Sequence, residues 1–325
     1  MLYSIIIPCY KSAASISEVV TLTMNELDML GRTPYEFILV DDYSPDNGET
    51  VAELHSLADR YDCVKSIELA QNAGQHNAIM AGLNYSTGDY IILMDDDMQT
   101  HPSQLRFLLD ELDKGYDLVF GYYPNKKHSL FRRFGTWVNY TSVRVLIGKP
   151  KDMKTSSFCV FKKFVRDEVI KYRGQYTYMQ GLFLRTTRNI SSVPIQHFER
   201  SHGTSGYTFK KLLKLWSNIM GFSIVPLRIA RNTGIFFSAV GILGAIAVVL
   251  RKLIMPHTTI GWASTMVAIC FFSGMIMLFL GLIGEYIGRM FQAMGNSPQY
   301  VIRKVYTGVS DEKLNNNDLD YFTRD

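Results

Sequence analysis

The sequence has few cysteines, and none of them form a close pair. Cys9, Cys63, Cys159 and Cys270 stand far apart, which argues against a CxxC-type zinc site or a disulfide framework. There is no GxGxxG turn and no GxxxxGK[ST] loop, so a nucleotide would have to bind without a glycine-rich phosphate cradle. The net charge of +4 gives no indication of a nucleic-acid-binding protein. Residues 1–3 lead directly into a strand pattern, and we expect no signal peptide.

Short apolar runs alternate with amphipathic segments through the first third of the chain. The runs that predict buried strands cover residues 3–7, 37–40, 64–69, 90–94 and 117–120. Segments with a helical spacing of apolar residues separate them, and Ser15 with Glu18 fits a capping box at the first helix. This alternation predicts an α/β fold with a mostly parallel, Rossmann-like sheet and helices on both faces.

Three consecutive aspartates, Asp95, Asp96 and Asp97, follow the fourth predicted strand. Open α/β sheets bind ligands at the carboxyl ends of their strands, and in an extended chain Asp95 and Asp97 share a face. Adjacent carboxylates repel each other unless a proton or cation lies between them, and Mg²⁺ takes one or two carboxylates plus substrate phosphates. With Gln99 as a further oxygen donor, the segment predicts a metal site. An acidic turn that caps the next helix is the alternative.

Asp41 and Asp42 close the second predicted strand and should lie on the same sheet edge as the triplet. An acidic residue at such a strand end commonly hydrogen-bonds a ribose or a base. The alternative is that Asp41 or Asp46 only caps the following helix.

Four segments together resemble family 2 glycosyltransferases. They are Pro8-Cys9-Tyr10, Val40-Asp41-Asp42-Tyr43-Ser44-Pro45-Asp46, Asn72-Ala73-Gly74-Gln75-His76-Asn77-Ala78 and Asp95-Asp96-Asp97-Met98-Gln99. More narrowly, about residues 1–305 are similar to the polyisoprenyl-phosphate branch, which includes dolichyl-phosphate mannose synthase and bacterial undecaprenyl-phosphate glycosyltransferases. Residues 74–82 are especially similar to the enzymes that load formyl-aminoarabinose onto undecaprenyl phosphate.

The resemblance implies a GT-A fold and assigns roles to residues of this chain. Asp95, Asp96 and Asp97 are the expected catalytic residues, with Asp96 the nearest candidate to contact the sugar. The nucleotide would be lined by Pro8, Tyr10, Val40, Asp42, Asp95 and Asp96. The cofactor, Mg²⁺ or Mn²⁺, would be held by Asp95, Asp97 and Gln99.

The expected reaction is an inverting, metal-dependent transfer from a nucleotide sugar, with a UDP-sugar favoured, to undecaprenyl phosphate. Its product would be a lipid-linked sugar for cell-envelope glycan synthesis or modification. For the acceptor phosphate, the expected residues are Arg132, Arg133, Ser156 and Arg200. Arg132 and Arg133 belong to a basic cluster at residues 126–133, for which a solvated basic face is the alternative.

Three positions depart from the family pattern. Ser12 stands where the mannose synthases have Glu, Tyr123 where many members carry Arg, and Gly206 where Lys is usual. The last two changes remove cations that would pair with phosphate oxygens. Candidates to replace them are Lys126, Lys127, Lys210 and Lys211. We favour an unusual sugar over a weakened activity as the explanation.

Two apolar stretches near the C-terminus, about residues 233–250 and 260–283, are long enough to cross a bilayer. The short linker between them predicts a helical hairpin, and the cations outside it favour ends on the cytosolic side. Upstream, residues 210–220 alternate lysines with apolar residues, as suits a helix on the membrane surface. A buried hairpin of a soluble protein is the alternative.

We therefore expect a cytosolic transferase domain (1–205), amphipathic juxtamembrane helices (206–231), a two-helix transmembrane hairpin (232–288) and a cytosolic tail (289–325). The protein should be a multi-pass protein of a bacterial-type inner (plasma) membrane with a cytoplasmic catalytic domain. Its partners would be a nucleotide sugar, a polyisoprenyl phosphate and the membrane, without nucleic acid; homo-oligomers are left open. Two alternatives remain: a processive or glycan-extending family 2 transferase, although the sequence has no Gln-x-x-Arg-Trp motif, and a non-catalytic membrane scaffold.

Overall fold

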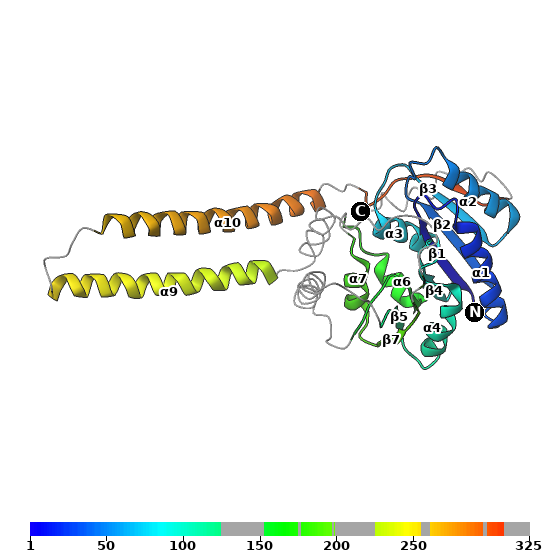
Figure 1. The fold of residues 1–325 in the computed structure, drawn as a ribbon, viewed down its shortest axis with the longest axis horizontal. Helices are drawn as coiled ribbons and strands as arrows, with labels where there is room; N and C mark the ends of the chain where they lie inside the picture. Colours follow the sequence, from blue (N-terminus) through cyan, green and yellow to red (C-terminus); the bar gives the residue numbers. More distant parts are fainter. Residues whose placement is uncertain are drawn as a thin grey trace. The chain divides into compact units, whose positions relative to one another are not determined.

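The computed structural model describes residues 1–124, 153–174, 177–196, 198, 225–254, 261–294 and 298–308, which form two units (Figure 1). The sheet unit contains, in chain order, β1 (Tyr3–Cys9), α1 (Ile16–Met29), β2 (Tyr35–Asp41), α2 (Glu49–Arg60), β3 (Val64–Leu69), α3 (Gln75–Tyr85), β4 (Tyr90–Leu93), the 3₁₀ turn η1 (Pro102–Gln104), α4 (Leu105–Leu112), β5 (Leu118–Tyr122), β6 (Cys159–Lys162), α6 (Lys163–Val169), α7 (Met179–Thr186), β7 (Ile190–Pro194) and β8 (Ile302–Tyr306). The helical unit consists of α9 (Val225–Ile254) and α10 (Trp262–Met294).

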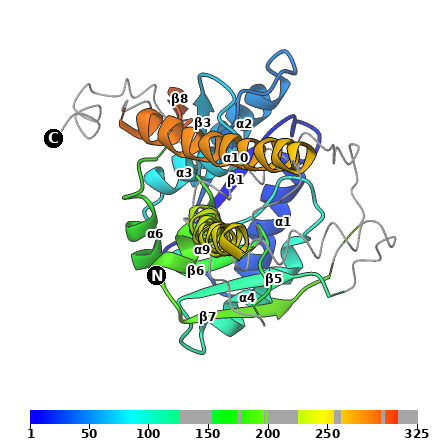
Figure 2. The same ribbon diagram turned by 90° about the vertical axis from the view of Figure 1, so that its left-hand side faces the viewer.

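The described strands form one eight-stranded sheet in the order β7-β5-β6-β4-β1-β2-β3-β8 (Figure 2). Strands β3, β2, β1 and β4 are parallel neighbours, while β6 and β8 run against the strands beside them. Since β7 is parallel to β5, the sheet is mostly parallel. The α/β fold class predicted from the alternation is therefore confirmed.

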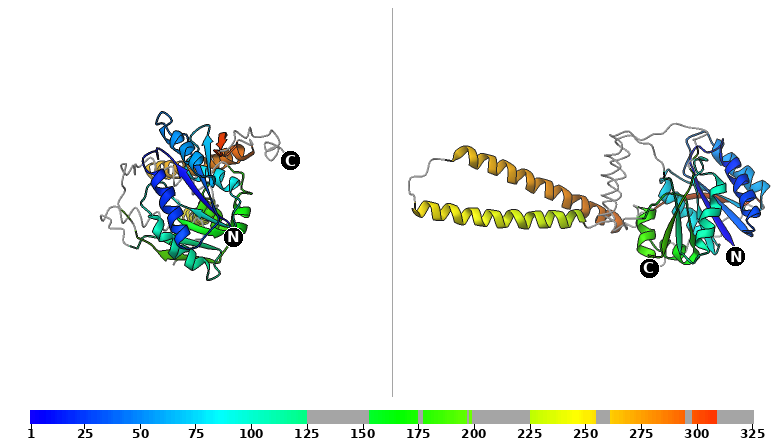
Figure 3. Two further views of the ribbon diagram at one scale, coloured as in Figure 1. Left: turned by 90° about the vertical axis from the view of Figure 1, so that its right-hand side faces the viewer. Right: turned by 60° about the horizontal axis from the view of Figure 1, so that its bottom comes forward.

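Helices cover both faces of the sheet: α1, α2 and α4 lie on one side, and α3, α6 and α7 on the other (Figures 1 and 3). Successive side chains of a strand point to opposite faces, so Ile5 packs in the core beneath α1 while Ile6 faces α3. Helix α3 approaches closely, because a Cβ added to Gly82 would lie 2.5 Å from Ile6 Cγ2. Each fully buried Ile, Leu or Phe contributes about 1.5–3 kcal/mol, which fixes the strand register.

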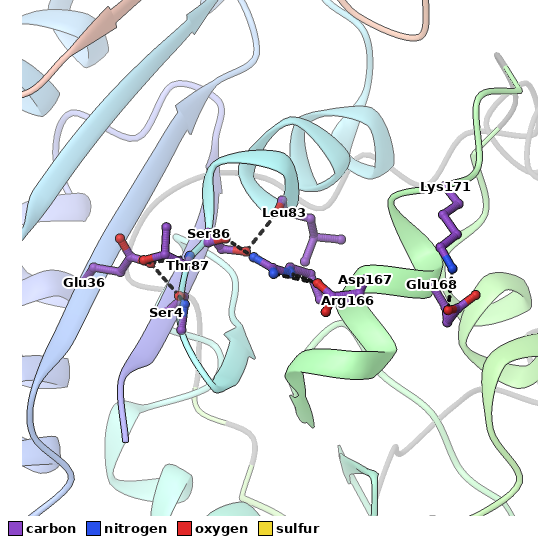
Figure 4. A network of polar contacts seen from close by, with 10 residues as sticks. Ser4, Glu36, Leu83, Ser86, Thr87, Arg166, Asp167, Glu168 and Lys171 are labelled. Atoms are coloured by element: carbon purple, nitrogen blue, oxygen red, sulfur yellow. Dashed lines mark hydrogen bonds and ion pairs between the residues drawn. The ribbon is translucent and has the colours of Figure 1, made fainter. Parts of the chain in front are cut away.

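A polar network ties together the amino-terminal side of the sheet, away from the strand ends that carry the aspartates (Figure 4). The Glu36 carboxylate is 8% exposed and accepts hydrogen bonds from Ser4 Oγ at 2.7 Å and from the Thr87 amide at 2.6 Å. Lys65 Nζ lies 3.1 Å from the same carboxylate. Arg166 of α6 reaches the carbonyl oxygen of Ser86 and joins α6 to this network.

The first helix begins without the predicted capping box. Ser15 is the N-cap residue of α1, but its side chain does not cap the helix. Its hydroxyl instead donates a 2.7 Å hydrogen bond to the carbonyl oxygen of Asp96. The capping-box prediction was wrong because the Ser15 hydroxyl binds the distant Asp96 carbonyl and not a backbone amide of α1. Ser15 therefore holds the loop that carries the triplet.

The chain returns to the sheet after the helical unit. Residues 302–306, which we expected in a tail, form β8 on the exposed edge of β3, antiparallel to it. Gln299 Nε2 donates to the carbonyl oxygens of Tyr172 and Gly174, and the Tyr306 hydroxyl donates to Asp59 Oδ1 at 2.6 Å. We call residues 299–308 the C-terminal strap.

The two helices of the helical unit run antiparallel, side by side (Figures 1 and 3). Within the described residues, one stretch is long and apolar enough to cross a membrane: Phe271–Gly288 in α10, with a mean hydropathy of 1.7 and none of it buried. The helical hairpin is therefore present, and a second span in α9 stays a prediction. The predicted surface helix at residues 210–220 lies outside the described residues, and residues 225–231 of the expected juxtamembrane segment belong to α9.

Candidate active site

The carboxyl ends of β1, β2 and β4 meet at one edge of the sheet, as the parallel register requires. Within the described residues, the positive φ angles outside glycine belong to Lys11, Tyr43, Asn47 and Met98. All four lie in the loops that follow these three strands. Residues in this sparsely populated conformation concentrate at functional sites, where the surroundings hold them in place. The strained loops mark this edge as the candidate site.

Asp95 lies just beyond β4, and both of its carboxylate oxygens accept hydrogen bonds. Gln75 Nε2 donates to Oδ1 at 2.7 Å, and the Ser157 hydroxyl donates to Oδ2. Burial raises the pKa of Asp95 to about 6, repulsion from Asp97 and Asp96 acts in the same direction, and the two hydrogen bonds oppose them. The carboxylate is thus fixed in orientation while its charge is unfavourable, a combination that a bound cation would relieve.

Asp96 faces the loop after β1. Its Oδ2 atom accepts a hydrogen bond from the Tyr10 amide at 3.2 Å and another from the Ser12 hydroxyl. Burial raises the pKa of Asp96, and the Ser12 hydrogen bond lowers it by less. The departure at Ser12 therefore has a local reason: a hydroxyl here donates to Asp96, whereas the glutamate of the mannose synthases would repel it.

Asp97 and Gln99 lie in bends after the strand, because β4 ends at Leu93. The extended conformation that would place Asp95 and Asp97 on one face therefore does not apply to this segment. Asp97 Oδ1 accepts a 3.1 Å hydrogen bond from the Gln99 amide, and the Gln99 carbonyl accepts one from Phe198. The loop brings all three predicted metal ligands to the same edge.

The chemistry of these residues fits a divalent cation. Neither Asp95 nor Asp96 forms an ion pair with any residue that the structure describes. In the same described ranges, no three His, Cys, Asp or Glu side chains are arranged to enclose a metal by themselves. A Mg²⁺-like ion held by one or two carboxylates and completed by substrate phosphates does not require such a cage.

Asp42 organises the loop that leads into α3. Its carboxylate accepts hydrogen bonds from the amides of Ala73 and Gly74 at 2.7 and 3.0 Å, and from Asn72 Nδ2 at 3.1 Å. This loop places Gln75 at the first position of α3, from which it reaches Asp95. Asp42 thus acts on the triplet through the backbone of this loop. Asp41 closes a local turn by accepting from Ser44 Oγ at 2.5 Å and does not cap α2; the helix-capping alternative is met by Asp46, whose Oδ2 accepts from the Thr50 amide in the first turn of α2 at 3.1 Å.

Of the other residues predicted to line the nucleotide, one is exposed and two are buried. Tyr10 is 49% exposed at the edge. Pro8 and Val40 are paired in the core of the sheet, and the fully buried Val40 side chain faces Gly82 of α3. The structure therefore does not bring the side chains of Pro8 and Val40 to the exposed edge with Tyr10.

Ser156, which was predicted to bind the acceptor phosphate, instead forms hydrogen bonds with backbone groups of the sheet unit. Its hydroxyl donates to the Gly121 carbonyl at 2.6 Å and accepts from the Phe158 amide at 3.1 Å, so the adjacent Ser157 is the serine that faces the triplet. Arg132, Arg133 and Arg200 lie outside the described residues, as do Gly206 and the four lysines considered as replacement cations.

Two further residues lie near this edge: Tyr123, already noted as a departure from the family pattern, and Lys154, which was not predicted from the sequence. Tyr123, which replaces the family's usual Arg, contacts the Thr100 hydroxyl, and burial raises its pKa, with the charges of Asp95 and Asp97 adding to the effect. Lys154 Nζ lies 4.2 Å from the ring centroid of Tyr122. A cation thus lies over the ring of the last residue of β5, next in sequence to the position at which the family's arginine is missing.

Comparison with known proteins extends the resemblance over most of the chain. Residues 4–215 match the model described as glycosyl transferase family 2, and residues 225–290 match the GtrB C-terminal hairpin. An uncharacterized glycosyltransferase of Bacillus subtilis (strain 168), YkcC, is 31% identical over 316 residues, covering 96% of each chain. The undecaprenyl-phosphate 4-deoxy-4-formamido-L-arabinose transferase of Enterobacter sp. (strain 638) is 30% identical over 318 residues, again covering 96% of each.

Among solved structures, glucosyl-3-phosphoglycerate synthase from Mycobacterium tuberculosis in complex with Mn²⁺ and UDP-glucose is similar with a TM-score of 0.48 and 16% identity. The match covers 68% of this chain and 78% of that one. A likeness this distant assigns no role to a residue here.

Proposed function

The chain belongs to glycosyl transferase family 2, and on this premise we propose that it transfers a sugar from a nucleotide sugar to undecaprenyl phosphate at the cytosolic face of a membrane. The observation that carries the proposal is a triplet of acidic residues, held by donors from three loops, in a chain that also carries the hairpin. The named activity of the relative from Enterobacter supports the acceptor class. A UDP-sugar remains the favoured donor.

In the proposed reaction, an oxygen of the lipid phosphate forms a bond to the anomeric carbon of the sugar. The bond from that carbon to the diphosphate oxygen breaks, and the nucleoside diphosphate leaves with the electron pair, so the configuration inverts. A phosphate monoester has a second pKa of about 6, so the nucleophile is already largely ionised at neutral pH. No strong general base is needed.

The residues of the chain have separate tasks in this scheme. Gln75 and Ser157 hold the Asp95 carboxylate in a fixed orientation. Ser12 and the Tyr10 amide both bind Oδ2 of Asp96, which leaves Oδ1 to accept from a sugar hydroxyl. A divalent cation, Mg²⁺ or Mn²⁺, held by Asp95, Asp97 and Gln99 would stabilise the charge that develops on the departing diphosphate.

We also propose that both helices of the hairpin cross the bilayer. Large apolar side chains on each helix are more than half exposed; they include Ile235, Phe236 and Leu243 on α9 and Phe271, Met277 and Leu280 on α10. Such surfaces are unfavourable in water and suit a lipid environment. The chain belongs to the sheet unit both before α9 and, as β8, after α10, and two crossings would return it to the side of the membrane from which it left.

The test is transfer of radiolabelled sugar from a panel of UDP- and GDP-sugars to undecaprenyl phosphate by the full-length protein in detergent, with and without Mn²⁺. We expect a lipid-extractable product with one sugar that requires the metal. Asp97→Ala should abolish it, whereas Asp110→Ala, at an exposed position on α4, should not. Products that carry several sugars would favour the processive or glycan-extending alternative. Nucleotide binding without transfer from any donor would favour the scaffold.

A further inference from the structure

The C-terminal strap places a cation on the donor side of the candidate site. The guanidinium carbon of Arg303 lies 5.5 Å from the ring centroid of Tyr43, which follows Asp42 at the end of β2. Tyr43 is 46% exposed and has a φ of 55°, so its ring is presented at the edge by a strained backbone. The strap lies outside both family matches, which end at residues 215 and 290.

A β-bulge presents Arg303. Leu69 of β3 pairs with Ile302 and Glu68 pairs with Lys304, so Arg303 between them has no partner residue on β3. Bulges redirect a side chain and are frequent beside active sites. The next residue, Lys304, lies 4.9 Å over the ring of Tyr306 on the same strand, so the two adjacent cations have different surroundings.

The docking of the strap is well defined on both sides of the bulge. The Ala70 amide donates to the Val301 carbonyl at 2.7 Å, and His55 stacks on Tyr306 with a centroid separation of 4.2 Å. Gly308 has a φ of 76°, and a Cβ there would lie 2.2 Å from the Ala58 carbonyl oxygen. Arg303 is thus held by backbone and aromatic contacts that do not involve its own side chain.

The guanidinium of Arg303 is exposed and forms no ion pair with any residue that the structure describes. It lies over the Tyr43 ring, a contact that uses none of its five N–H groups as hydrogen-bond donors and so leaves them to bind acceptors. The triplet follows β4, and Tyr43 follows β2, two strand spacings or about 10 Å away. This span is within the reach of a nucleoside diphosphate whose phosphates lie at the triplet and whose base lies at Tyr43 and Arg303.

We propose that Arg303 and Tyr43 form the outer wall of the nucleobase subsite, with Arg303 donating hydrogen bonds to the carbonyl or ring-nitrogen acceptors of the base. Arg303 is then a specificity-determining residue supplied by the segment that follows the hairpin. This inference rests on the proposed use of a nucleotide sugar.

The experiment measures binding of UDP, GDP, CDP, ADP and dTDP to the full-length protein in detergent with Mn²⁺, by titration calorimetry. For the nucleotide that binds wild type, Arg303→Gln should raise the Kd about tenfold. The Kd of the nucleoside with the same base should rise by a similar factor. The affinity for pyrophosphate, measured by competition, should be the same in wild type and in Arg303→Gln. Arg303→Lys should recover part of the affinity, and Lys304→Gln on the same strand should match wild type.

Wild-type affinity in Arg303→Gln would overturn the inference and leave the proposed function intact. Equal weakening of pyrophosphate would also overturn it, because Arg303 would then act on the phosphates. If wild type binds no nucleoside diphosphate, both proposals fail together. The thermal unfolding midpoint of each variant, measured alongside, separates lost binding from an undocked strap. With sugar transfer as the readout, Arg303→Gln should raise the KM for the donor and leave kcat within about twofold.

Discussion

The Ser157 hydroxyl donates a hydrogen bond to the Asp95 carboxylate, although 62 residues separate the two in the chain. The sheet topology explains the contact. Strand β6 runs antiparallel to β4 with Cys159 opposite Leu93, so the residues that precede β6 lie beside those that follow β4. The neighbouring Ser156 points the other way and binds backbone, which makes these two serines a matched pair for mutagenesis.

We predict that Ser157→Ala weakens Mn²⁺ binding to the full-length protein about tenfold, because loss of a residue that orients a metal ligand typically costs 10–100-fold in affinity. Manganese EPR titration measures the change. Ser156→Ala should lower the unfolding midpoint with little change in Mn²⁺ affinity. Equal losses of affinity in both variants would contradict the assignment.

We predict that Asp95→Asn is more stable than wild type at pH 7 in the absence of divalent metal. The folded-state pKa of about 6 lies above the ordinary value of 3.8, so ionised Asp95 opposes folding, and this cost is complete above pH 6. A shift of about two pKa units corresponds to at most ~3 kcal/mol. As the pH falls below 4, Asp95 is protonated in both states and the advantage should vanish.

Chemical denaturation of both proteins in EDTA at pH 7 and pH 3.5 checks this prediction. Asp110→Asn, at an exposed position on α4, is the control and should leave stability within about 0.5 kcal/mol. A destabilised Asp95→Asn at pH 7 would mean that its hydrogen bonds from Gln75 and Ser157 outweigh the cost of burying the charge.

We predict that Lys154→Ala raises the KM for undecaprenyl phosphate about tenfold with kcat near wild type. Lys154 is an exposed cation that lies over the Tyr122 ring at the carboxyl end of β5, and a charge-assisted hydrogen bond to phosphate contributes roughly 1.5–3 kcal/mol. Steady-state transfer at varied acceptor concentration measures it. The control is Lys171→Ala, an exposed lysine on the surface beyond α6. A rise confined to the KM for the donor would place Lys154 at the donor diphosphate and contradict its assignment to the acceptor phosphate.

We predict that Glu36→Gln destabilises the protein by about 1–3 kcal/mol at pH 7, because the new amide group meets donors rather than acceptors. Burial alone would raise the pKa of Glu36, but the hydrogen bonds from Ser4 and Thr87 and the charge of Lys65 outweigh it and lower the pKa. The carboxylate therefore stabilises the fold above its unfolded-state pKa, and this contribution is lost as the pH falls through the folded-state pKa.

Denaturant unfolding at several pH values should show the difference between Glu36→Gln and wild type shrinking as the pH falls. Glu168→Gln, which breaks an exposed pair with Lys171, should have almost no effect at any pH. A difference that stays constant with pH would show that the charge of Glu36 is not what stabilises the network.

The first five strands could be predicted because each contains a short run of apolar residues that sequence alone reveals. The strands β1 to β5 overlap the five predicted runs. Strand β8 could not be found in this way, because the adjacent cations Arg303 and Lys304 interrupt its apolar residues after a membrane-like segment and are typical of flanking charge. Strand β6 inserts between β4 and β5 out of chain order, which no local pattern encodes.

The site was predictable to the extent that its chemistry lies in one segment. The three consecutive aspartates identified the candidate metal ligands in the sequence, and the sheet topology brings them to the expected edge. The residues that orient them, Gln75, Ser157 and Ser12, come from three other loops, so their roles depend on tertiary contacts. Ser15 shows the same limit, because the capping-box pattern was present and its hydroxyl is nevertheless bound to Asp96.

The position of β8 also constrains how the protein is made. The edge of β3 is complete only when the strap emerges from the ribosome, after both helices of the hairpin. Between the synthesis of Leu69 and that of Ile302, on the order of 10–50 s pass at usual translation rates, and during this time the edge can pair with other chains. Synthesis of both hairpin helices therefore precedes closure of the sheet, and nascent chains stalled within α10 should be the species that chaperones bind.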